Sequence, residues 1–190
     1  MRLFIGVELS EAVRTAAGGA ISRLEAQVAG VAADFRARWI PPANLHITVW
    51  FLGEVADEPA SVLMEALRPP LRTEAFELEL RGCGAFPRSG PPRVLWIGTG
   101  EGTSRMVQAY GELTRRLTPL GHAPEERPYS PHLTIARVKD PGRGARVIRQ
   151  VLAAETADCG SMTVSALTLF RSRLSPHGAA YESLQRVPLT

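Results

Sequence analysis

Apolar residues recur along the chain with two spacings, one typical of strands and the other typical of helices. Apolar runs of the strand type lie at residues 2–9, 45–52, 76–80, 93–99, 131–138, 162–170 and 181–187. Apolar positions three or four apart predict helices that start after Ser10, at Asp57, before Met106 and near Val147. The Gly- and Pro-rich stretch 81–92 is typical of a loop. The pattern predicts that strands and helices alternate.

The order of these elements repeats. Strand, helix, strand, helix and strand follow one another in the first half, the same series follows in the second half, and a last strand ends the chain. This repeat predicts a diverged duplication. With 190 residues, we expect a single domain of two pseudo-symmetric lobes, from sequence halves of roughly 1–90 and 91–190, which can interleave in space.

One short signature stands in the second strand of each half. Residues 46–49 read HITV and residues 132–135 read HLTI, 86 positions later. Residues i and i+2 of a strand share a face, so His46 projects with Thr48, and His132 with Thr134. If the halves pack about a pseudo-twofold axis, the two strands lie side by side. Two imidazoles and two hydroxyls then converge on one groove.

A single histidine of this kind is weak evidence, because an ordinary half-buried strand histidine gives the same pattern. Two of the chain's four histidines at matching places in a repeated element favour a functional site. The other two serve as controls. His122 follows a helix-ending glycine and His177 lies in a predicted hairpin loop, so we interpret both as structural or incidental.

The bulk composition is that of a compact globular protein. Hydrophobic residues make up 45% and charged residues 22% of the chain. No apolar run approaches the roughly 18 to 20 residues of a membrane span, and the start lacks a signal-peptide pattern, so a cytoplasmic protein is expected. Cys83 and Cys159 stand far apart without the spacing of a zinc motif, and both are expected to be reduced.

The basic residues are almost all arginine: Lys139 is the single lysine among 22 basic residues. Residues 96–190 carry 12 basic and 8 acidic residues and are the more basic half. Arginine forms bidentate contacts with phosphate, which suits an RNA or nucleotide ligand, although a GC-rich genome gives the same bias. Lys139 stands in KDPG instead of the KxDG of lysyl-adenylate ligases, and no P-loop is present. Chemistry that depends on a catalytic lysine is therefore not expected.

Residues 44–55, NLHITVWFLGEV, and 131–140, PHLTIARVKD, closely resemble the twin HxTx motifs of the two-histidine phosphoesterase superfamily. The nearest branch is the RNA 2′,3′-cyclic phosphodiesterases, also named 2′-5′ RNA ligases. Residues 2–14, 84–98 and 167–189 resemble it too, while Val49 and Ile135 replace its more usual leucine. The resemblance implies a bilobed α+β fold, with antiparallel sheets lining a central cleft and helices on the outside. It implies no metal and no cofactor.

Opening a 2′,3′-cyclic phosphate with water requires a base for the nucleophile and an acid for the departing oxygen. Histidine titrates near neutral pH and can serve as either, and hydroxyls such as those of Thr48 and Thr134 can donate to the phosphate oxygens. The residues alone do not distinguish the two histidines. The resemblance implies that His46 is the proton donor to the 3′-oxygen and His132 the proton acceptor from water, which leaves a 2′-phosphate.

The resemblance also implies the partners. The substrate is RNA with a 2′,3′-cyclic phosphate end, such as a tRNA fragment, or a small nucleotide cyclic phosphate. Run in reverse with an RNA 5′-hydroxyl, the same site forms a 2′-5′ linkage without ATP. No dimerisation element is visible, so a monomer is expected.

Three neighbouring residues have two interpretations each. Arg137 faces away from His132 on an unbroken strand and forms a surface or inter-strand ion pair, or it reaches the phosphate if the strand bulges or ends before it. Tyr129 stacks on a base or packs in the core. Trp50 shares the face of His46 and lies on the cleft floor or beneath it, and it is not expected to contact a ligand.

Two other classes of protein compete with this interpretation. A metal-dependent hydrolase would use His46 and His132 as ligands, but a bound metal normally has three or more protein ligands and neither motif contains a carboxylate. A non-catalytic RNA-binding module would not need histidine and threonine intact in both motifs.

Overall fold

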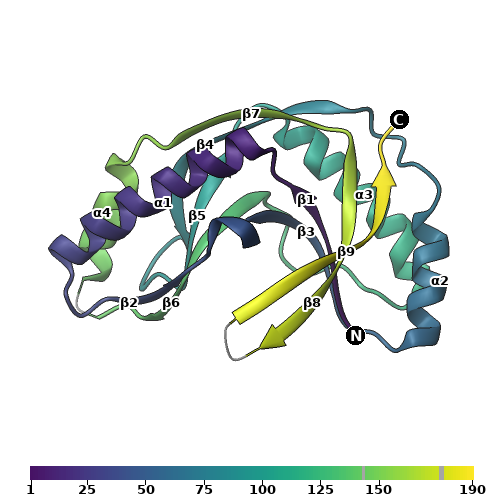
Figure 1. Ribbon diagram of the computed structural model, residues 1–190, viewed down its shortest axis with the longest axis horizontal. Helices are drawn as coiled ribbons and strands as arrows, with labels where there is room; N and C mark the ends of the chain where they lie inside the picture. Colours follow the sequence, from purple (N-terminus) through teal and green to yellow (C-terminus); the bar gives the residue numbers. More distant parts are fainter. Residues whose placement is uncertain (143, 176–177) are drawn as a thin grey trace.

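The computed structural model describes residues 1–142, 144–175 and 178–190, which form a curled antiparallel half-barrel sheet with helices packed beside it (Figure 1). The predicted α+β class is confirmed. The elements in chain order are β1 (Arg2–Glu8), α1 (Glu11–Val31), β2 (Arg36–Trp39), the 3₁₀ helix η1 (Pro42–Asn44), β3 (His46–Glu54), α2 (Asp57–Leu67), β4 (Phe76–Phe86), β5 (Val94–Thr99), α3 (Thr103–Leu117), the 3₁₀ helix η2 (Thr118–Leu120), β6 (His132–Asp140), α4 (Ala145–Ala154), β7 (Asp158–Val164), β8 (Ala166–Ser175) and β9 (Gly178–Pro188).

The strands of the described residues form one continuous sheet, in the order β7-β4-β5-β6-β3-β1-β8-β9, with β2 paired to β6. From the sequence, we expected more than one sheet. The strands form a single sheet because β3 and β6 pair at the middle of the order, where Ile47 lies opposite Leu133. The two HxTx strands are therefore neighbours at the centre of the sheet.

The sequence pattern differs from the observed strands in three places: it ended one strand too early, merged two strands into one and missed a short one. The predicted loop 81–92 begins as strand, because β4 continues to Phe86. The predicted strand 162–170 is two strands, β7 and β8, which lie in different parts of the sheet. Strand β2 is too short and too exposed to show a clear period. Within the predicted loop around His177, residues 176 and 177 lie outside the described residues.

The glycine content of β4 explains why the sequence predicted a loop for the end of this strand. The indole of Trp96, on the neighbouring strand β5, packs across Gly84, and a Cβ added there would lie 2.3 Å from ring atoms. A glycine that normally marks a turn is here required by a cross-strand contact.

The helices form where the 3.6-residue period predicted them. Ser10 caps the first turn of α1 by accepting a hydrogen bond from the backbone N–H of Val13 (3.3 Å). The apolar positions that gave the helical period in α1 are buried: Val13, Ala17, Ile21, Leu24 and Val28. Helices α1 and α4 pack on β7 and β4, whereas α3 packs on β3 and also contacts α2 (Figure 1). None of the helices in the described ranges is long and apolar enough to cross a membrane.

Candidate active site

Strands β3 and β6 have the same burial pattern, residue for residue. His46 and Thr48 are half-buried and alternate with Ile47 and Val49, which are buried; residues 132–135 of β6 repeat this arrangement. Burial of the apolar positions anchors each strand in the core. The histidine and threonine of each motif therefore project together from the opposite face.

The point where the strands meet fixes how the four side chains are arranged. Because β3 and β6 run antiparallel and pair at Ile47 and Leu133, His46 and Thr134 lie to one side of that point, and Thr48 and His132 to the other. Two cavities open here. One, of about 370 Å³, is lined by His132 and not by His46. The other, of about 550 Å³, is lined by His46 and not by His132.

We call these spaces the His132 cavity and the His46 cavity. Five residues line both of them, and both threonines of the motifs are in this set. The two spaces therefore meet at the threonines, with one histidine on each side. The shared residues are Thr48, Phe51, Glu125, Thr134 and Arg137.

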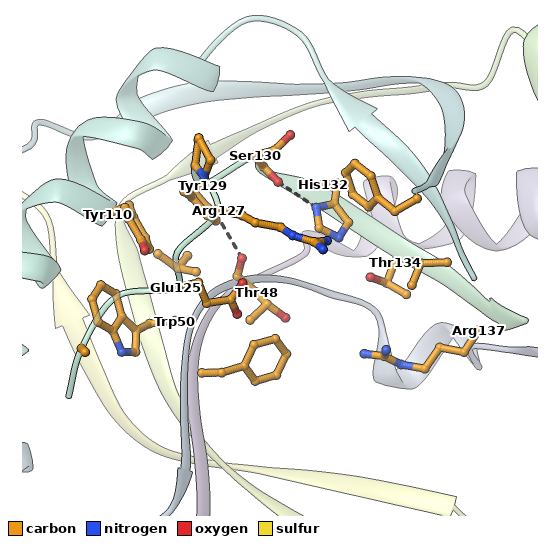
Figure 2. Close-up of a pocket in the computed structure, with 16 residues that line it drawn as sticks. Thr48, Trp50, Tyr110, Glu125, Arg127, Tyr129, Ser130, His132, Thr134 and Arg137 are labelled. Carbon is orange, nitrogen blue, oxygen red and sulfur yellow. Dashed lines mark hydrogen bonds between the residues drawn. The ribbon is translucent and has the colours of Figure 1, made fainter. Parts of the chain in front are cut away.

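Both imidazoles are held in the same way. Nδ1 of His46 lies 2.9 Å from the carbonyl oxygen of Asn44. Nδ1 of His132 lies 2.7 Å from the carbonyl oxygen of Ser130, a contact that Figure 2 shows. A carbonyl oxygen only accepts, so each Nδ1 carries the hydrogen and donates it. Nε2 of each ring is then the atom left for proton exchange with a ligand.

Aromatic rings restrain the two imidazoles. The Phe4 ring lies 4.7 Å from that of His46, centroid to centroid, and Tyr181 meets His46 edge-on at 4.9 Å. On the other side, Phe86 meets His132 edge-on at 5.0 Å. These contacts come from β1, β9 and β4, so three further strands orient the histidines.

The surroundings lower the pKa of both histidines. Burial is the main cause for each, and the charge of Arg137 acts in the same direction, while the hydrogen bonds to Asn44 and Ser130 raise the pKa. Glu125 raises the pKa of His132 as well. Both imidazoles therefore favour the neutral form more than a free histidine does. A phosphate anion bound beside them would raise both pKa values again.

A bulge decides the direction of Arg137. Leu95 of β5 pairs with Ala136 and Trp96 pairs with Thr134, so Ile135 is an extra residue in β6. Ala136 is buried as a result, and the exposed Arg137 lines both cavities. Figure 2 shows its guanidinium group directed toward the region of Thr134 and Thr48. Of the two alternatives for Arg137, the structure has the bulged strand, in which the side chain faces the cavities.

The same irregularity occurs in β3 and reveals a residue that the sequence patterns did not single out. Ile5 pairs with Trp50 and Gly6 with Thr48, so Val49 is the extra residue. Trp50 is buried, whereas Phe51 is 53% exposed and lines both cavities. Phe51 stands 86 positions before Arg137, the same interval that separates the histidines, and that interval was the available signal.

The Tyr129 side chain packs against other residues of the protein. Its ring stacks on Tyr110 with centroids 4.6 Å apart, and its hydroxyl donates to the carbonyl oxygen of Thr48 (3.1 Å, Figure 2). Burial raises the pKa of this hydroxyl, which therefore stays protonated. Tyr110 in turn packs against Trp50. Tyr129 lines the His132 cavity, but these contacts agree with the packing interpretation better than with base stacking.

Metal-binding residues do not gather at this site. Within residues 1–142, 144–175 and 178–190, no three His, Cys, Asp or Glu side chains lie together in a way that could hold a metal ion.

Comparisons with known proteins bear on this geometry. The family model of the 2′-5′ RNA ligase superfamily matches residues 14–175. An RNA 2′,3′-cyclic phosphodiesterase of Aeropyrum pernix is 34% identical over 89% of this chain and 94% of its own length. One from Methanothermobacter thermautotrophicus is 32% identical over 97% of both chains. The crystal structure of E. coli LigT complexed with 3′-AMP is similar with a TM-score of 0.73 at 26% identity, covering 100% of this chain and 98% of LigT.

Proposed function

The chain belongs to the 2′-5′ RNA ligase superfamily, and we propose that it is an RNA 2′,3′-cyclic phosphodiesterase that opens the cyclic phosphate to a 2′-phosphate. The observation that carries this proposal is the arrangement of the twin motifs. Each histidine has its own cavity and a free Nε2, and the two threonines lie where the cavities meet. This geometry suits an in-line displacement at phosphorus.

The reaction begins on the side of His132. Neutral His132 accepts the proton of a water molecule at Nε2 while the water oxygen attacks phosphorus. Its Nδ1–H remains bonded to the Ser130 carbonyl, which stabilises the imidazolium that forms. Glu125, which raises the pKa of His132, makes it a stronger base.

The leaving group departs on the side of His46. Protonated His46 donates from Nε2 to the ribose 3′-oxygen as the P–O3′ bond breaks, so the products are a 2′-phosphomonoester and a 3′-hydroxyl. The substrate phosphate favours this protonated form, because it offsets the lowering of the His46 pKa by burial and by Arg137.

The residues between the histidines stabilise the charge that develops on the phosphoryl oxygens. Thr48 and Thr134 donate from their hydroxyls, and Arg137 supplies a positive charge that both cavities share. Phe51, exposed in the same place, offers a face on which a base can stack. No step in this scheme uses a metal ion or a cofactor.

Hydrolysis and regiochemistry are tested together. An oligonucleotide with a 2′,3′-cyclic phosphate end is incubated with the protein in excess EDTA, and the product phosphate is located by ³¹P NMR. We expect undiminished turnover and a 2′-phosphate. Loss of turnover with EDTA would favour a metal-dependent hydrolase, a 3′-phosphate would reverse the regiochemistry, and RNA binding without turnover would indicate a non-catalytic module.

The reverse reaction is part of the proposal. An RNA 5′-hydroxyl that takes the place of water beside His132 would attack the same phosphorus and form a 2′-5′ linkage without ATP. Joining of a cyclic-phosphate-ended RNA to a 5′-hydroxyl RNA, with a product that resists 3′-5′-specific nucleases, tests this directly.

The bilobed, pseudo-symmetric architecture belongs to the same proposal. Three observations support a duplicated unit. Strands β3 and β6 have matching burial patterns and matching bulges, at Val49 and Ile135. They also lie at the centre of the sheet order, with three further strands of that order on each side. Its two copies contribute one proton carrier each.

A further inference from the structure

The His46 cavity contains more positive charge than the cyclic phosphate requires. Three arginines line it, and none of them forms an ion pair or a side-chain hydrogen bond within the described part of the chain. Some arginines elsewhere are neutralised by a carboxylate, such as Arg23 by Glu155 and Arg171 by Glu182. Glu125 is the acidic residue that lines the cavity. The three arginines are Arg2, Arg38 and Arg137.

Two of these arginines face each other across a strand pair. Arg38 of β2 lies opposite Arg137 of β6, and both side chains are exposed to the same cavity. Residues opposite one another in an antiparallel pair are about 5 Å apart at Cα, and like charges in this position repel and destabilise the sheet. An anion between or beside the two guanidinium groups would relieve that repulsion.

Arg2 reaches the same space from another strand. It lies on β1, opposite Ser172 of β8, which also lines the His46 cavity. Strands β1 and β2 do not pair with each other, so the positive charge comes from separate parts of the sheet. The three arginines thus line one cavity of about 550 Å³ from different strands.

The direction of the RNA follows from the proposed function, on which this inference rests. If His46 protonates the 3′-oxygen, the terminal ribose lies on the His46 side of the phosphorus. The RNA continues from the 5′-carbon of that ribose, so its next phosphodiester also lies on this side. The nucleophile occupies the opposite, His132 cavity.

We propose that Arg2 and Arg38 bind the phosphodiester immediately 5′ of the terminal nucleotide, while Arg137 serves the cyclic phosphate. Guanidinium groups bind phosphate through two parallel hydrogen bonds, and their long side chains reach across a cavity of this size. The site then selects RNA ends, or nucleotides that carry a 5′-phosphate, over nucleoside 2′,3′-cyclic phosphates that have none.

Three substrates that differ by one group each test this inference. They are a nucleoside 2′,3′-cyclic phosphate, the same compound with a 5′-phosphate, and a dinucleotide with the same cyclic end. For the wild-type protein, we expect kcat/KM to rise about tenfold when the first 5′-phosphate is added, as for one charge-assisted contact. The dinucleotide should add little beyond this.

Arg2→Gln and Arg38→Gln should each remove most of that gain while retaining the turnover of the nucleoside substrate, which also reports that the variant is folded. Each should flatten the dependence of log(kcat/KM) on log[salt] for the dinucleotide by about 0.7. Two matched variants serve as controls. Arg186→Gln changes an exposed arginine of β9 that lines neither cavity, and Arg127→Gln removes a charge from the His132 cavity. Both should retain the wild-type ratio between the substrates.

The results of this experiment distinguish a failure of the inference from a failure of the proposed function. No turnover of any of the three substrates contradicts the proposed function and the inference with it. Turnover without a preference for the 5′-phosphate contradicts the inference alone. If Arg127→Gln loses the 5′-phosphate preference as much as Arg2→Gln and Arg38→Gln do, the inference is also contradicted. The net charge of the cleft, and not a site at Arg2 and Arg38, would then attract the RNA.

Discussion

His46 and His132 occupy equivalent strand positions, yet their surroundings differ. His46 packs against Phe4 and Tyr181, whereas His132 contacts Phe86 and is affected by the charge of Glu125. In both, a backbone carbonyl two residues earlier holds Nδ1. The same local geometry thus presents the same atom to the cleft, and the surroundings adjust its acidity.

Removal of either imidazole should abolish efficient turnover. His46→Ala and His132→Ala each lose one proton transfer, so kcat should fall by about 10²- to 10⁴-fold. Both rings are only half-buried, and the unfolding midpoint should change little. His122→Ala changes a loop histidine that itself lines neither cavity, so it is the control and should match the wild type. Wild-type turnover in either active-site variant would falsify the two-histidine mechanism.

Arg137 should control the pH dependence. One histidine must be protonated and the other neutral, so kcat/KM should follow a bell whose limbs report two free-enzyme pKa values, both below the ordinary value for histidine. The positive charge of Arg137 disfavours protonation. In Arg137→Gln both pKa values rise, so the whole bell should move to higher pH, measured as kcat/KM from pH 4 to 9. Unmoved limbs would mean that this charge does not reach the imidazoles.

Bulges are the features of individual strands that complete the site. Without the extra residues Val49 and Ile135, strict alternation would direct Phe51 and Arg137 away from the face of the histidines. A strand also depends on its partner. Trp96 of β5 packs over Gly84 of β4 and lies near Phe86, the residue that contacts His132.

Gly84→Ala tests this support. The new methyl group would meet the Trp96 ring, so the variant should lose about 1 to 3 kcal/mol of unfolding free energy through overpacking. It should also lower kcat, because the contact of Phe86 with His132 shifts. Gly111→Ala in α3 is the matched control: nothing lies within 4 Å of its added Cβ, and it should gain about 0.5 to 1 kcal/mol. Urea denaturation of both variants measures the difference, and equal stabilities would contradict the packing argument.

Across the whole molecule, contacts between distant segments hold the halves together. Glu112 of α3 is buried and accepts hydrogen bonds from the backbone N–H of Arg72 and the hydroxyl of Thr73, each 2.7 Å long. The N–H of Thr190 donates to the carbonyl oxygens of Leu71 and Thr73. One carboxylate thus fixes a segment that also anchors the end of the last strand.

Glu112→Gln should lower the unfolding free energy by about 1 to 3 kcal/mol at neutral pH, because a charged acceptor of two hydrogen bonds is lost. Burial alone would raise the pKa of Glu112, but these hydrogen bonds outweigh it and lower the pKa. A lowered pKa stabilises the fold above the pKa of the unfolded chain, and this is lost as the pH falls. The difference between wild type and variant should therefore shrink below about pH 4, as measured by denaturation at several pH values. A difference that does not depend on pH would argue against the charged form.

Much of the candidate site could be predicted from local spacing. The i, i+2 relation placed each histidine beside its threonine, the 3.6-residue period placed α1 through α4, and the 86-residue repeat related the two motifs. These features depend on residues close in the chain or on a comparison of the chain with itself. No knowledge of the packed structure is needed for them.

The tertiary structure decided the rest, because it depends on which strands pair. Bulges arise from the register with β1 and β5, and they brought Phe51 and Arg137 into the cleft. Stacking on Tyr110 directed Tyr129 into the packing of the protein. The pairing of β2 with β6 set Arg38 opposite Arg137, and no periodicity in the sequence contains that information. The sequence alone determined which groups we propose to carry the chemistry, while long-range pairing determined which charges and rings surround them.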